Sequence, residues 1–470
     1  PIRIFIQPDG QAAACQAWRA VISCLRRLAE DCPIRGMKIP MTRRRFLRAN
    51  LTFTFAAASL PHLVPASVLG QGQSSPNSRI QVGCIGVGPQ GRGVMSNFLP
   101  QTDCRVIALC DVAKRNLDAA LQMVNGHYKD QACAKHHDYR ELLLNPEIDI
   151  VHIATPPHWH GIMSVDAARA GKDVWCEKPM TRTIGEGKKV VEAIQRNGRI
   201  FRLNTWFRFQ DGFYGFGTTV APIKKLVDSG MLGWPLKVFV GGTTGFNWKF
   251  NWSGMTNLTP EPVPETLDYD FWLGPAPYKP YHPHRVHATF RGYWDYDGGG
   301  LGDMGQHYLD PVQYFLGKDD TSPVEVEVDA PQQHPDAVSS WRRIVLRYAD
   351  GCEIILDGEG TDTSKPYIEG PDGKLFKGFQ SDIPNLEKKL AQFPDPEPQM
   401  TDFAEAVRTR TKFALNESNG HRSCTIVNIA KTAVQLGRNL RFDPVKQEFI
   451  DDAGANRLVY QPMRAPWQLS

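Results

Sequence analysis

The chain reads Arg79-Ile-Gln-Val-Gly-Cys-Ile-Gly-Val-Gly-Pro-Gln-Gly91, an apolar run that breaks into the pattern Gly-x-Gly-x-x-Gly. The apolar residues predict a buried parallel strand. In such a turn Gly86 permits a tight bend, Gly88 lets the backbone approach a pyrophosphate, and Gly91 lets the following helix pack close to the strand. The amide groups and positive dipole end of that helix would face the phosphates. The residues expected to hold the phosphates are Gly86, Gly88, Pro89, Gln90 and Gly91.

A second apolar run, Arg105-Val-Ile-Ala-Leu-Cys-Asp111, ends in an acid twenty residues after the last glycine. A carboxylate at that place accepts hydrogen bonds from the adenosine ribose and repels a 2′-phosphate, so Asp111 favours NAD over NADP. Lys114 and Arg115 lie close enough to leave NADP open. A glycine-rich turn in an unrelated α/β protein is the alternative for the glycine pattern alone.

Strands continue to alternate with helices after this point, which predicts a doubly wound parallel sheet. Ligands bind at the carboxyl ends of parallel strands, where the Thr155-Pro156-Pro157 loop and the Glu177-Lys178-Pro179 turn both lie. Both are therefore expected to face a bound dinucleotide. The further predicted strands are residues 149–154, 173–176 and 200–204, and the predicted helices include residues 162–170 and 186–197.

These motifs together resemble the Gfo/Idh/MocA oxidoreductase family, whose members include glucose-fructose oxidoreductase and inositol dehydrogenase. The resemblance rests on the glycine turn, Asp111, Thr155-Pro156-Pro157-x-x-His160, Glu177-Lys178-Pro179 and Gly302-Asp303-Met304-Gly305-Gln306-His307. It implies a Rossmann domain at residues 79–206. It also implies, at residues 207–470, a substrate-binding and oligomerisation domain of α/β type with a large open, mainly antiparallel sheet. The expected cofactor contacts outside the glycine turn are Asp111, Thr155, Pro156, His160, Glu177, Lys178 and Asn204.

Oxidation of a sugar hydroxyl needs a hydride acceptor, a base for the hydroxyl proton and a cation beside the developing alkoxide. Lys178 follows a strand end, and the resemblance implies that it contacts substrate and nicotinamide ribose. Asp303 and His307 are four residues apart, on one face if residues 304–314 are helical. Histidine carries protons near neutral pH, and the resemblance implies that His307 is the acid/base and Asp303 a substrate ligand or orienting group. The structural alternative makes Asp303 a helix cap and His307 a packed side chain.

Residues 246–296 hold thirteen aromatic side chains among many prolines and glycines. Aromatic faces with polar rims suit sugar rings, but these side chains can equally pack the segment onto the second domain or onto another subunit. Arg291 is a further candidate for the substrate cleft. The substrate-binding residues predicted from this part of the chain and from residues near 206 are Trp206, Arg208, Tyr293 and Trp294.

Histidines occur close together at His158 and His160, and again at His282, His284 and His287. Neither group includes cysteine or a second well-spaced pair, so no metal site is predicted.

The amino-terminal part contains Thr42-Arg43-Arg44-Arg45-Phe46-Leu47-Arg48, which matches the twin-arginine export pattern, followed by a short apolar stretch and a polar linker at residues 70–78. Residues 1–78 are therefore expected to be a leader with a twin-arginine signal, and the protein to be periplasmic after contact with the twin-arginine translocation machinery. The apolar stretch is too short and proline-broken for a stable membrane span. A basic tail without export function is the alternative. Since such signals begin shortly before the arginines, Met37 or Met41 is the expected start, and residues 1–36 are expected to be a separate extension or a misassigned start.

Charge and cysteine usage agree with this division. Residues 1–78 hold ten Lys/Arg and three Asp/Glu, so the rest of the chain, whose total is +4, carries a net charge of about −3. This balance gives no basic excess for binding nucleic acid. Cys84, Cys110 and Cys176 fall on predicted buried strands, a pattern of reduced core thiols that suits folding before export.

The sequence therefore predicts an NAD(P)-dependent oxidoreductase that transfers a hydride between nicotinamide and a hydroxyl of a sugar, glycoside or cyclitol. A protein outside the cytoplasm has no free NAD pool, so the cofactor is expected to be tightly bound and recycled, and the family resemblance favours a homo-oligomer. Two alternatives remain. One is a glycosidase that oxidises its sugar transiently with NAD to allow elimination, and the other is a catalytically silent sugar- or nucleotide-binding protein.

Overall fold

The computed structural model describes residues 79–469, apart from residue 206 and residues 210–216, 242–243, 245 and 359–361. The leader and twin-arginine signal predicted for residues 1–78 lie outside the described residues. Within the described part of the chain, no helix combines the length and hydrophobicity needed to cross a membrane.

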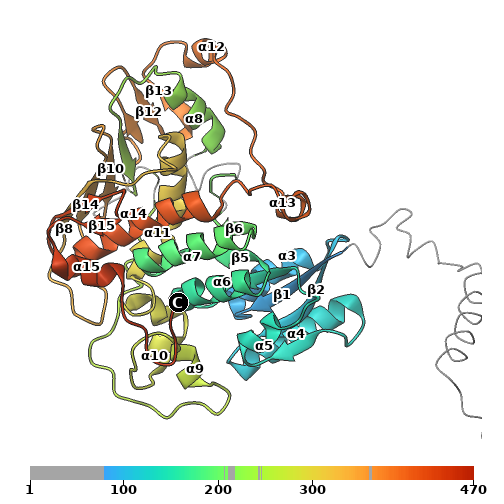
Figure 1. The fold of residues 1–470 in the computed structure, drawn as a ribbon. Helices are drawn as coiled ribbons and strands as arrows, with labels where there is room; N and C mark the ends of the chain where they lie inside the picture. The colour runs from blue at the N-terminus through green and yellow to red at the C-terminus, as the bar shows by residue number, and fades with distance from the viewer. Residues whose placement is uncertain are drawn as a thin grey trace, which may run out of the picture. The chain divides into compact units, whose positions relative to one another are not determined.

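The first part of the described chain forms a six-stranded parallel sheet in the order β3-β2-β1-β4-β5-β6. This arrangement confirms the predicted doubly wound sheet (Figure 1). One strand, β3, was not predicted, because its three residues are not an apolar run. The strands are β1 (Ile80–Ile85), β2 (Cys104–Cys110), β3 (Ala134–His136), β4 (Ile150–Ile153), β5 (Asp173–Glu177) and β6 (Phe201–Asn204). The helices between them are α3 (Pro89–Phe98), α4 (Lys114–Tyr128), α5 (Tyr139–Leu143), α6 (His160–Arg169) and α7 (Ile184–Arg196).

The strand order reverses between β1 and β4, which are neighbours in the sheet. Gly86 follows the end of β1, and Thr155 lies just beyond the end of β4. In doubly wound sheets the crevice outside this reversal is the place where dinucleotides bind. The fold therefore brings the glycine turn and the Thr155 loop to the same edge of the sheet.

The second sheet has nine strands in the order β13-β12-β11-β7-β10-β9-β8-β14-β15. Only β7 and β10 pair in parallel, so the expectation of a large, mainly antiparallel sheet is confirmed. Residues 368–381, within a stretch whose proline, glycine and charge content predicts a surface excursion from the second domain, supply three short strands at one edge of this sheet. The strands are β7 (Lys237–Val240), β8 (Glu325–Asp329), β9 (Arg343–Arg347), β10 (Glu353–Asp357), β11 (Ile368–Glu369), β12 (Lys374–Phe376), β13 (Gln380–Ser381), β14 (Leu440–Asp443) and β15 (Glu448–Phe449).

Three helices pack with this sheet around one apolar core: α8 (Val220–Asp228), α11 (Gly299–Phe315) and α14 (Glu417–Leu436). Helices α11 and α14 lie side by side (Figure 1). The α14 helix starts where it does because the Asn416 side chain accepts hydrogen bonds from the amides of the first turn, while Asn419 reaches back to the Asn416 amide. The α11 helix begins five residues before its predicted start at Met304. Asp303 therefore lies inside the helix and is not its cap.

The segment rich in aromatics folds into short helices, α9 (Tyr269–Leu273) and α10 (Pro283–Val286), with a 3-10 turn at Ala288–Gly292. Five of its thirteen rings are buried in a separate apolar cluster, and Trp248 and Trp294 are buried in the core of the second sheet, so packing accounts for more than half of them. The buried rings of that cluster are Tyr269, Trp272, Tyr281, Tyr293 and Tyr296. The remaining helices are α12 (Leu386–Leu390), α13 (Phe403–Thr409) and α15 (Ala453–Val459).

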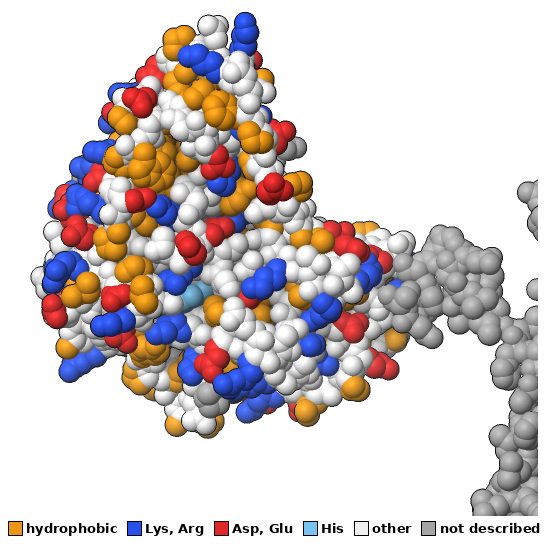
Figure 2. All heavy atoms as spheres, turned by 45° about the horizontal axis from the view of Figure 1, so that its top comes forward, with side chains coloured by type: hydrophobic (Ala, Val, Ile, Leu, Met, Phe, Trp, Pro, Cys, Tyr) orange, Lys and Arg blue, Asp and Glu red, His pale blue; other side chains and the backbone are white. Residues whose placement is uncertain are grey.

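The seven cysteines in the described residues are all free thiols, and six of them are buried, as expected for reduced core cysteines. On the face shown in Figure 2, Lys and Arg side chains of the described residues are interspersed with Asp and Glu.

Candidate functional site

The glycine turn has the shape that a bound pyrophosphate requires. Gly86 has φ +79°, and a Cβ there would lie 2.6 Å from the Thr155 amide nitrogen. A Cβ on Gly91 would lie 1.9 Å from the Gly86 carbonyl oxygen, so the helix can approach this closely only with glycine. At Gly88 the nearest atom would be 3.7 Å away, which leaves the turn open, and α3 begins directly after it at Pro89. The residues present therefore fit phosphate groups at the start of α3.

Asp111 lies just beyond the end of β2 and connects the glycine turn to the next loop. Its carboxylate accepts hydrogen bonds from the amides of Val87 (2.9 Å) and Ala113 (2.8 Å). Burial raises the pKa of Asp111, although these two amides oppose the shift. The carboxylate is thus held at the strand end where a ribose diol would bind.

His160 ties together the two loops at the carboxyl edge of the sheet. Its Nδ1 lies 2.7 Å from the Pro179 carbonyl oxygen, and its Nε2 lies 2.8 Å from the Thr155 carbonyl oxygen. Both ring nitrogens are therefore engaged with the backbone. The structure gives His160 a positioning role between Thr155–Pro156 and Lys178–Pro179, and leaves no ring nitrogen for a bound cofactor.

Glu177 and Asn204 lie at the ends of neighbouring strands β5 and β6. The Asn204 amide donates a 2.5 Å hydrogen bond to Glu177 Oε1, and His152 Nε2 lies 3.5 Å from the same oxygen. Both residues are buried. The Glu177 carboxylate thus fixes the strand end from which the next residue, Lys178, extends.

Lys178, whose side chain is 12% exposed, and the buried Asp303 form an ion pair that joins the parallel-sheet part of the chain to α11. Lys178 Nζ donates to Asp303 Oδ1 at 2.8 Å and to the Asp303 carbonyl oxygen at 2.5 Å. Arg291 Nε donates to Oδ1 at 2.8 Å, and Trp252 Nε1 donates to Oδ2 at 3.1 Å. Lys249 Nζ lies 3.5 Å from Oδ2. Three cations and an indole therefore surround one carboxylate.

The charge of Asp303 is stabilised by this surrounding. Burial opposes its ionisation, but Lys178 and Arg291 outweigh burial and hold the pKa of the carboxyl well below its usual range. Arg291 was a candidate from the sequence, and Trp252 was one of the thirteen rings of the aromatic segment. Lys249 was missed, because no local pattern marks it.

His307 lies one helical turn after Asp303 and is buried. Its Nδ1 is 2.6 Å from the Thr205 hydroxyl, and its ring stacks on Phe207 with centroids 4.5 Å apart. Burial, and next the charge of Lys178, lower the pKa of His307 well below its ordinary value. The imidazole is therefore neutral at neutral pH and able to accept a proton.

Asp297 is a buried acid next to this group that the sequence did not single out. It is 1% exposed, and its Oδ1 has no hydrogen-bond partner among the described residues. Oδ1 would lie 2.3 Å from a Cβ on Gly302, the residue before Asp303. Burial, and next the charge of Asp303, raise the pKa of Asp297 to about 7, while Lys431, Arg291 and Lys178 oppose the rise.

The raised pKa of Asp297 leads to a stability prediction. The folded protein keeps this proton up to about pH 7, whereas the unfolded chain releases it near 3.8. The stability that the retained proton on Asp297 gives the folded protein is therefore complete below about pH 4 and is lost as the pH rises to 7. We expect the free energy of unfolding of wild type, relative to Asp297→Asn, to fall across this window by up to about 1.4 kcal/mol per pH unit. Denaturant unfolding of both proteins at pH 4.5–7.5 measures the difference, and parallel curves would contradict the raised pKa.

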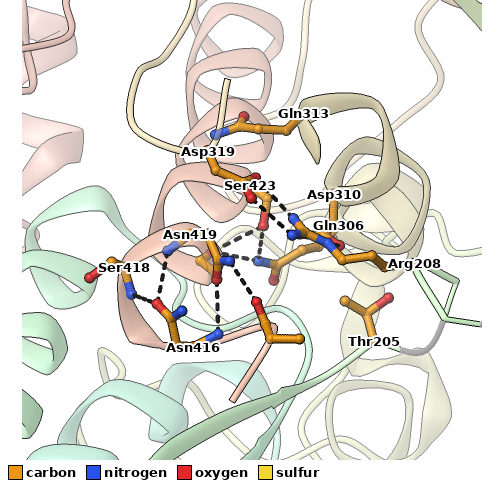
Figure 3. A network of polar contacts seen from close by, with 12 residues as sticks. Thr205, Arg208, Gln306, Asp310, Gln313, Asp319, Asn416, Ser418, Asn419 and Ser423 are labelled. Carbon is orange, nitrogen blue, oxygen red and sulfur yellow. Dashed lines mark hydrogen bonds and ion pairs between the residues drawn. The ribbon is translucent and has the colours of Figure 1, made fainter. Parts of the chain in front are cut away.

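A polar network fixes α11 against its neighbours (Figure 3). The Gln306 side chain accepts a hydrogen bond from the Met180 amide at 2.8 Å. It also donates to the Gly420 carbonyl oxygen at 2.8 Å and to the Ser423 hydroxyl at 2.9 Å. One side chain thus connects α11, the loop after Lys178 and α14. This connection orients Asp303 and His307, which lie on the same helix.

Arg208, a predicted substrate ligand, is instead a structural residue. Its side chain is 0% exposed and forms ion pairs with Asp310 (2.8 Å) and Asp319 (2.9 Å) (Figure 3). Asp310 lies on α11, and Asp319 lies just after it. The position of Arg208 in the sequence, close to a predicted strand end, did not reveal these partners, which are more than one hundred residues away.

The other predicted substrate contacts also differ from expectation. Tyr293 is fully buried, and its hydroxyl is shared with the Met255 amide and His284 Nδ1. Trp294 is 5% exposed and donates to the His334 carbonyl oxygen. Both rings therefore pack the aromatic segment and offer little surface to a ligand. Trp206 lies outside the described residues.

The histidines considered for metal binding are engaged elsewhere. His158 Nε2 lies 3.0 Å from the Trp272 carbonyl oxygen, and burial lowers the pKa of His158 to about 3. His282 Nδ1 accepts a hydrogen bond from the His284 amide. In the parts of the chain that the structure describes, no three His, Cys, Asp or Glu side chains form a group that could hold a metal ion.

Both halves of the chain match models of a known protein family. Residues 80–205 match the family model described as "Oxidoreductase family, NAD-binding Rossmann fold", and residues 216–469 match "Oxidoreductase family, C-terminal alpha/beta domain", both of the Gfo/Idh/MocA family. Glycosyl hydrolase family 109 protein 2 of Shewanella sp. (strain ANA-3) is 34% identical over 173 residues, 33% of this chain and 38% of that protein. Inositol 2-dehydrogenase of Salmonella typhimurium is 28% identical over 207 residues, 43% of this chain and 56% of that protein. The chain thus matches less than two thirds of either relative.

Solved structures show the same fold at lower identity. The aldose-aldose oxidoreductase of Caulobacter crescentus is 20% identical with a TM-score of 0.51, covering 77% of this chain and 100% of that one. The WlbA dehydrogenase of Bordetella pertussis, solved with NADH and UDP-GlcNAcA, is 16% identical with a TM-score of 0.52, covering 78% and 99%. Because the two family models together span most of the chain, this protein belongs to the Gfo/Idh/MocA oxidoreductase family and carries an NAD-binding Rossmann domain.

Proposed function

We propose that this protein is an NAD(P)-dependent oxidoreductase that transfers a hydride between nicotinamide and a hydroxyl group of a sugar, glycoside or cyclitol. The observation that carries the proposal is the group of Lys178, Asp303 and His307. It combines a cation with an orienting carboxylate and a neutral imidazole that lie one turn apart on α11. Relatives whose names denote an inositol dehydrogenase and an aldose-aldose oxidoreductase support the substrate class.

The dinucleotide would be held by the glycine turn, the start of α3 and Asp111, whose geometry fits it. When bound, the nicotinamide ring supplies the hydride acceptor or donor. The two loops that His160 joins, Thr155–Pro156 and Lys178–Pro179, would flank the nicotinamide.

Lys178 would bind the reacting oxygen of the substrate. Its ammonium group has three donors, and Asp303 accepts from it at two atoms. This leaves a donor and a positive charge for the oxygen, which gains negative charge as its proton leaves. Asp303, held by Arg291 and Trp252, would keep the ammonium in place.

His307 would take the hydroxyl proton at Nε2 during oxidation and return it during reduction. The Thr205 hydroxyl at Nδ1 and the stacked Phe207 ring fix the orientation of the imidazole. Because the pKa of His307 is lowered, the ring is unprotonated at neutral pH and ready to act as a base.

The test begins with the nucleotide. Purified protein is denatured and any released nucleotide identified by mass spectrometry, and the folded protein is then assayed for reduction of added NAD or NADP with aldoses, sugar acids and cyclitols. Reduction with at least one of these supports the proposal. Binding of the nucleotide without turnover on any of them would favour the silent binding protein.

A second candidate is a glycosidase that oxidises its sugar transiently to allow elimination. The 34% identity to a protein named for glycosyl hydrolase family 109 favours it. Both functions need the same cation and base. Release of an aglycone from a nitrophenyl glycoside with no net change in NADH absorbance would identify the glycosidase, whereas NADH accumulation in proportion to oxidised sugar would identify the dehydrogenase.

Asp111 supports a preference for NAD over NADP, because its carboxylate would repel a 2′-phosphate. We expect Asp111→Ser to shift the ratio of the two dissociation constants toward NADP by about tenfold or more, roughly the 1.4 kcal/mol of one charge contact. Titration calorimetry with both nucleotides measures this ratio. Asp111→Asn, which keeps the side-chain shape, separates the charge from the hydrogen bonds to Val87 and Ala113. An unchanged ratio in both variants would contradict the assignment.

We further propose that the protein is exported by the twin-arginine route to the periplasm, retains its cofactor tightly, and assembles as a homo-oligomer through the open sheet. The motif at residues 42–48 and the free core thiols support export in a folded state. Cell fractionation of wild type and an Arg43→Lys/Arg44→Lys/Arg45→Lys variant tests export. Periplasmic wild type that lacks nucleotide would contradict a retained cofactor.

A further inference from the structure

One short part of the aromatic segment contacts both loops that are expected to hold the two ends of the dinucleotide. This crossing segment, residues 266–275, contains α9. Two backbone hydrogen bonds of 2.9 and 3.1 Å and one antiparallel bridge join its first residues to residues 112–114. That loop follows Asp111, whose carboxylate accepts a hydrogen bond from the Ala113 amide at 2.8 Å. The start of the crossing segment is therefore fixed to the loop of the expected ribose site.

The other end of the crossing segment contacts the loop that follows β4. His158 Nε2 and Trp159 Nε1 lie 3.0 and 2.9 Å from the Trp272 carbonyl oxygen. Gly274 has φ +47°, and a Cβ there would lie 2.0 Å from Trp159 Cζ2, so this close approach requires glycine. Because the loop after β4 is expected to flank the nicotinamide, the crossing segment connects the two ends of the expected cofactor site.

The last residues of the chain hold the crossing segment in place. The Arg464 guanidinium donates to Asp270 Oδ1 at 2.5 Å, to the Asp270 carbonyl oxygen at 2.6 Å and to the Gly274 carbonyl oxygen at 3.0 Å. The Arg464 amide donates to the Pro275 carbonyl oxygen at 2.9 Å. One arginine thus satisfies carbonyl groups at the end of α9, which have no partner within the helix.

Trp467 lies against both the crossing segment and the loop after β4. Its ring stacks on Phe271, with centroids 5.4 Å apart and planes at 11°, and meets Trp159 edge to face at 4.8 Å. Both are favourable geometries for aromatic pairs. Trp159 precedes His160, whose ring nitrogens contact the backbone of Thr155 and Pro179. The indole therefore supports the loop that leads to the reacting end of the site.

We propose that Arg464 and Trp467 are positioning residues for the dinucleotide. They fix the crossing segment, which holds the loop after β4 at the distance from residues 112–114 that NAD spans. A site held in its binding geometry loses less free energy to ordering when the ligand binds. The inference rests on the proposed function, since it concerns the same cofactor site.

Titration calorimetry of the full chain with NAD and with AMP tests this role. AMP lacks the nicotinamide half and does not span both loops. In Arg464→Ala/Trp467→Ala we expect the NAD dissociation constant to rise about tenfold, within the usual range of coupling between sites, and that of AMP to stay within about twofold. AMP is spared because the backbone pairing with residues 112–114 remains. Arg438→Ala is the matched control: it removes a two-bond ion pair with Asp452 and should change neither constant.

The two ligands separate positioning from a general loss of structure. Unchanged NAD affinity in the double variant, or an equal loss for NAD and AMP, would overturn the inference. Wild type that binds neither NAD nor NADP would overturn the proposed function as well. Wild type that binds NAD, together with a double variant of the same affinity, contradicts the positioning role alone.

The reciprocal effect is measured in wild type and does not depend on the folding of a variant. Coupling is mutual, so if the docked residues 464–467 strengthen NAD binding, NAD must stabilise their docking by the same factor. We expect saturating NAD to slow hydrogen exchange of a peptide covering residues 460–469 by about tenfold, and AMP to leave it unchanged. Exchange that NAD does not slow, or that AMP slows equally, would contradict the positioning role.

Discussion

His307→Ala is expected to lower turnover by about 10²–10⁴-fold, the usual contribution of a positioned acid/base, while nucleotide affinity stays within a factor of about two. The reason is that the imidazole is neutral and oriented by Thr205, whereas the predicted nucleotide contacts lie in the glycine turn. The measurement is steady-state kcat with the best substrate, together with calorimetric titration of NAD. A loss of turnover with retained NAD binding would assign the acid/base to His307.

The matched control is His137→Ala. His137 follows β3 in the parallel-sheet part of the chain. Its side chain is 55% exposed and pairs with Asp268, so its removal should leave kcat unchanged. His307→Ala that retains wild-type kcat would remove the imidazole from the mechanism. Loss of both turnover and NAD binding would instead indicate that the variant is misfolded, which circular dichroism detects.

The local features of the fold could be predicted from the sequence because each depends on neighbours in the chain. The strand before Gly86 and the acid at the end of β2 are examples, since both follow from runs of a few residues. The early start of α11 could not be predicted, because Gly299, Gly300 and Gly302 are poor helix formers. They are tolerated because other backbone packs against them: a Cβ on Gly300 would lie 1.5 Å from the Trp248 carbonyl oxygen.

Residues of the candidate site could be predicted from the sequence where they belong to a motif. Residues that join the site only through contacts between distant parts of the chain could not. Lys178, Asp303 and His307 were identified from motifs, and the structure brings Lys178 and Asp303 into contact and places His307 one helical turn away. The positions of Lys249 and Asp297 beside Asp303 follow only from tertiary packing, because neither has a signature in its own segment. Residue type identifies a chemically capable group, but only the fold decides what it contacts.

Arg208 illustrates the same limit and leads to the largest expected effect on stability. We expect Arg208→Ala to lower the free energy of unfolding by about 3–5 kcal/mol, because it leaves Asp310 buried without its partner. Asp310 is fully buried, and burial raises its pKa while Arg208 opposes the rise. Denaturant unfolding at pH 7 measures the loss. Arg457→Ala, an exposed arginine on α15, should change stability by no more than about 0.5 kcal/mol.

A double variant separates the lost ion pair from lost packing. Asp310→Asn in the Arg208→Ala background removes the stranded charge while keeping the shape of the acid, so part of the lost stability should return. If Arg208→Ala costs less than about 1 kcal/mol, Asp310 is solvated or protonated without penalty, and the pair behaves as an exposed one. Because Asp310 lies three residues after His307 on α11, a destabilised pair also loosens the helix that carries the proposed base. Arg208 would then influence catalysis through the position of α11, with no contact to substrate.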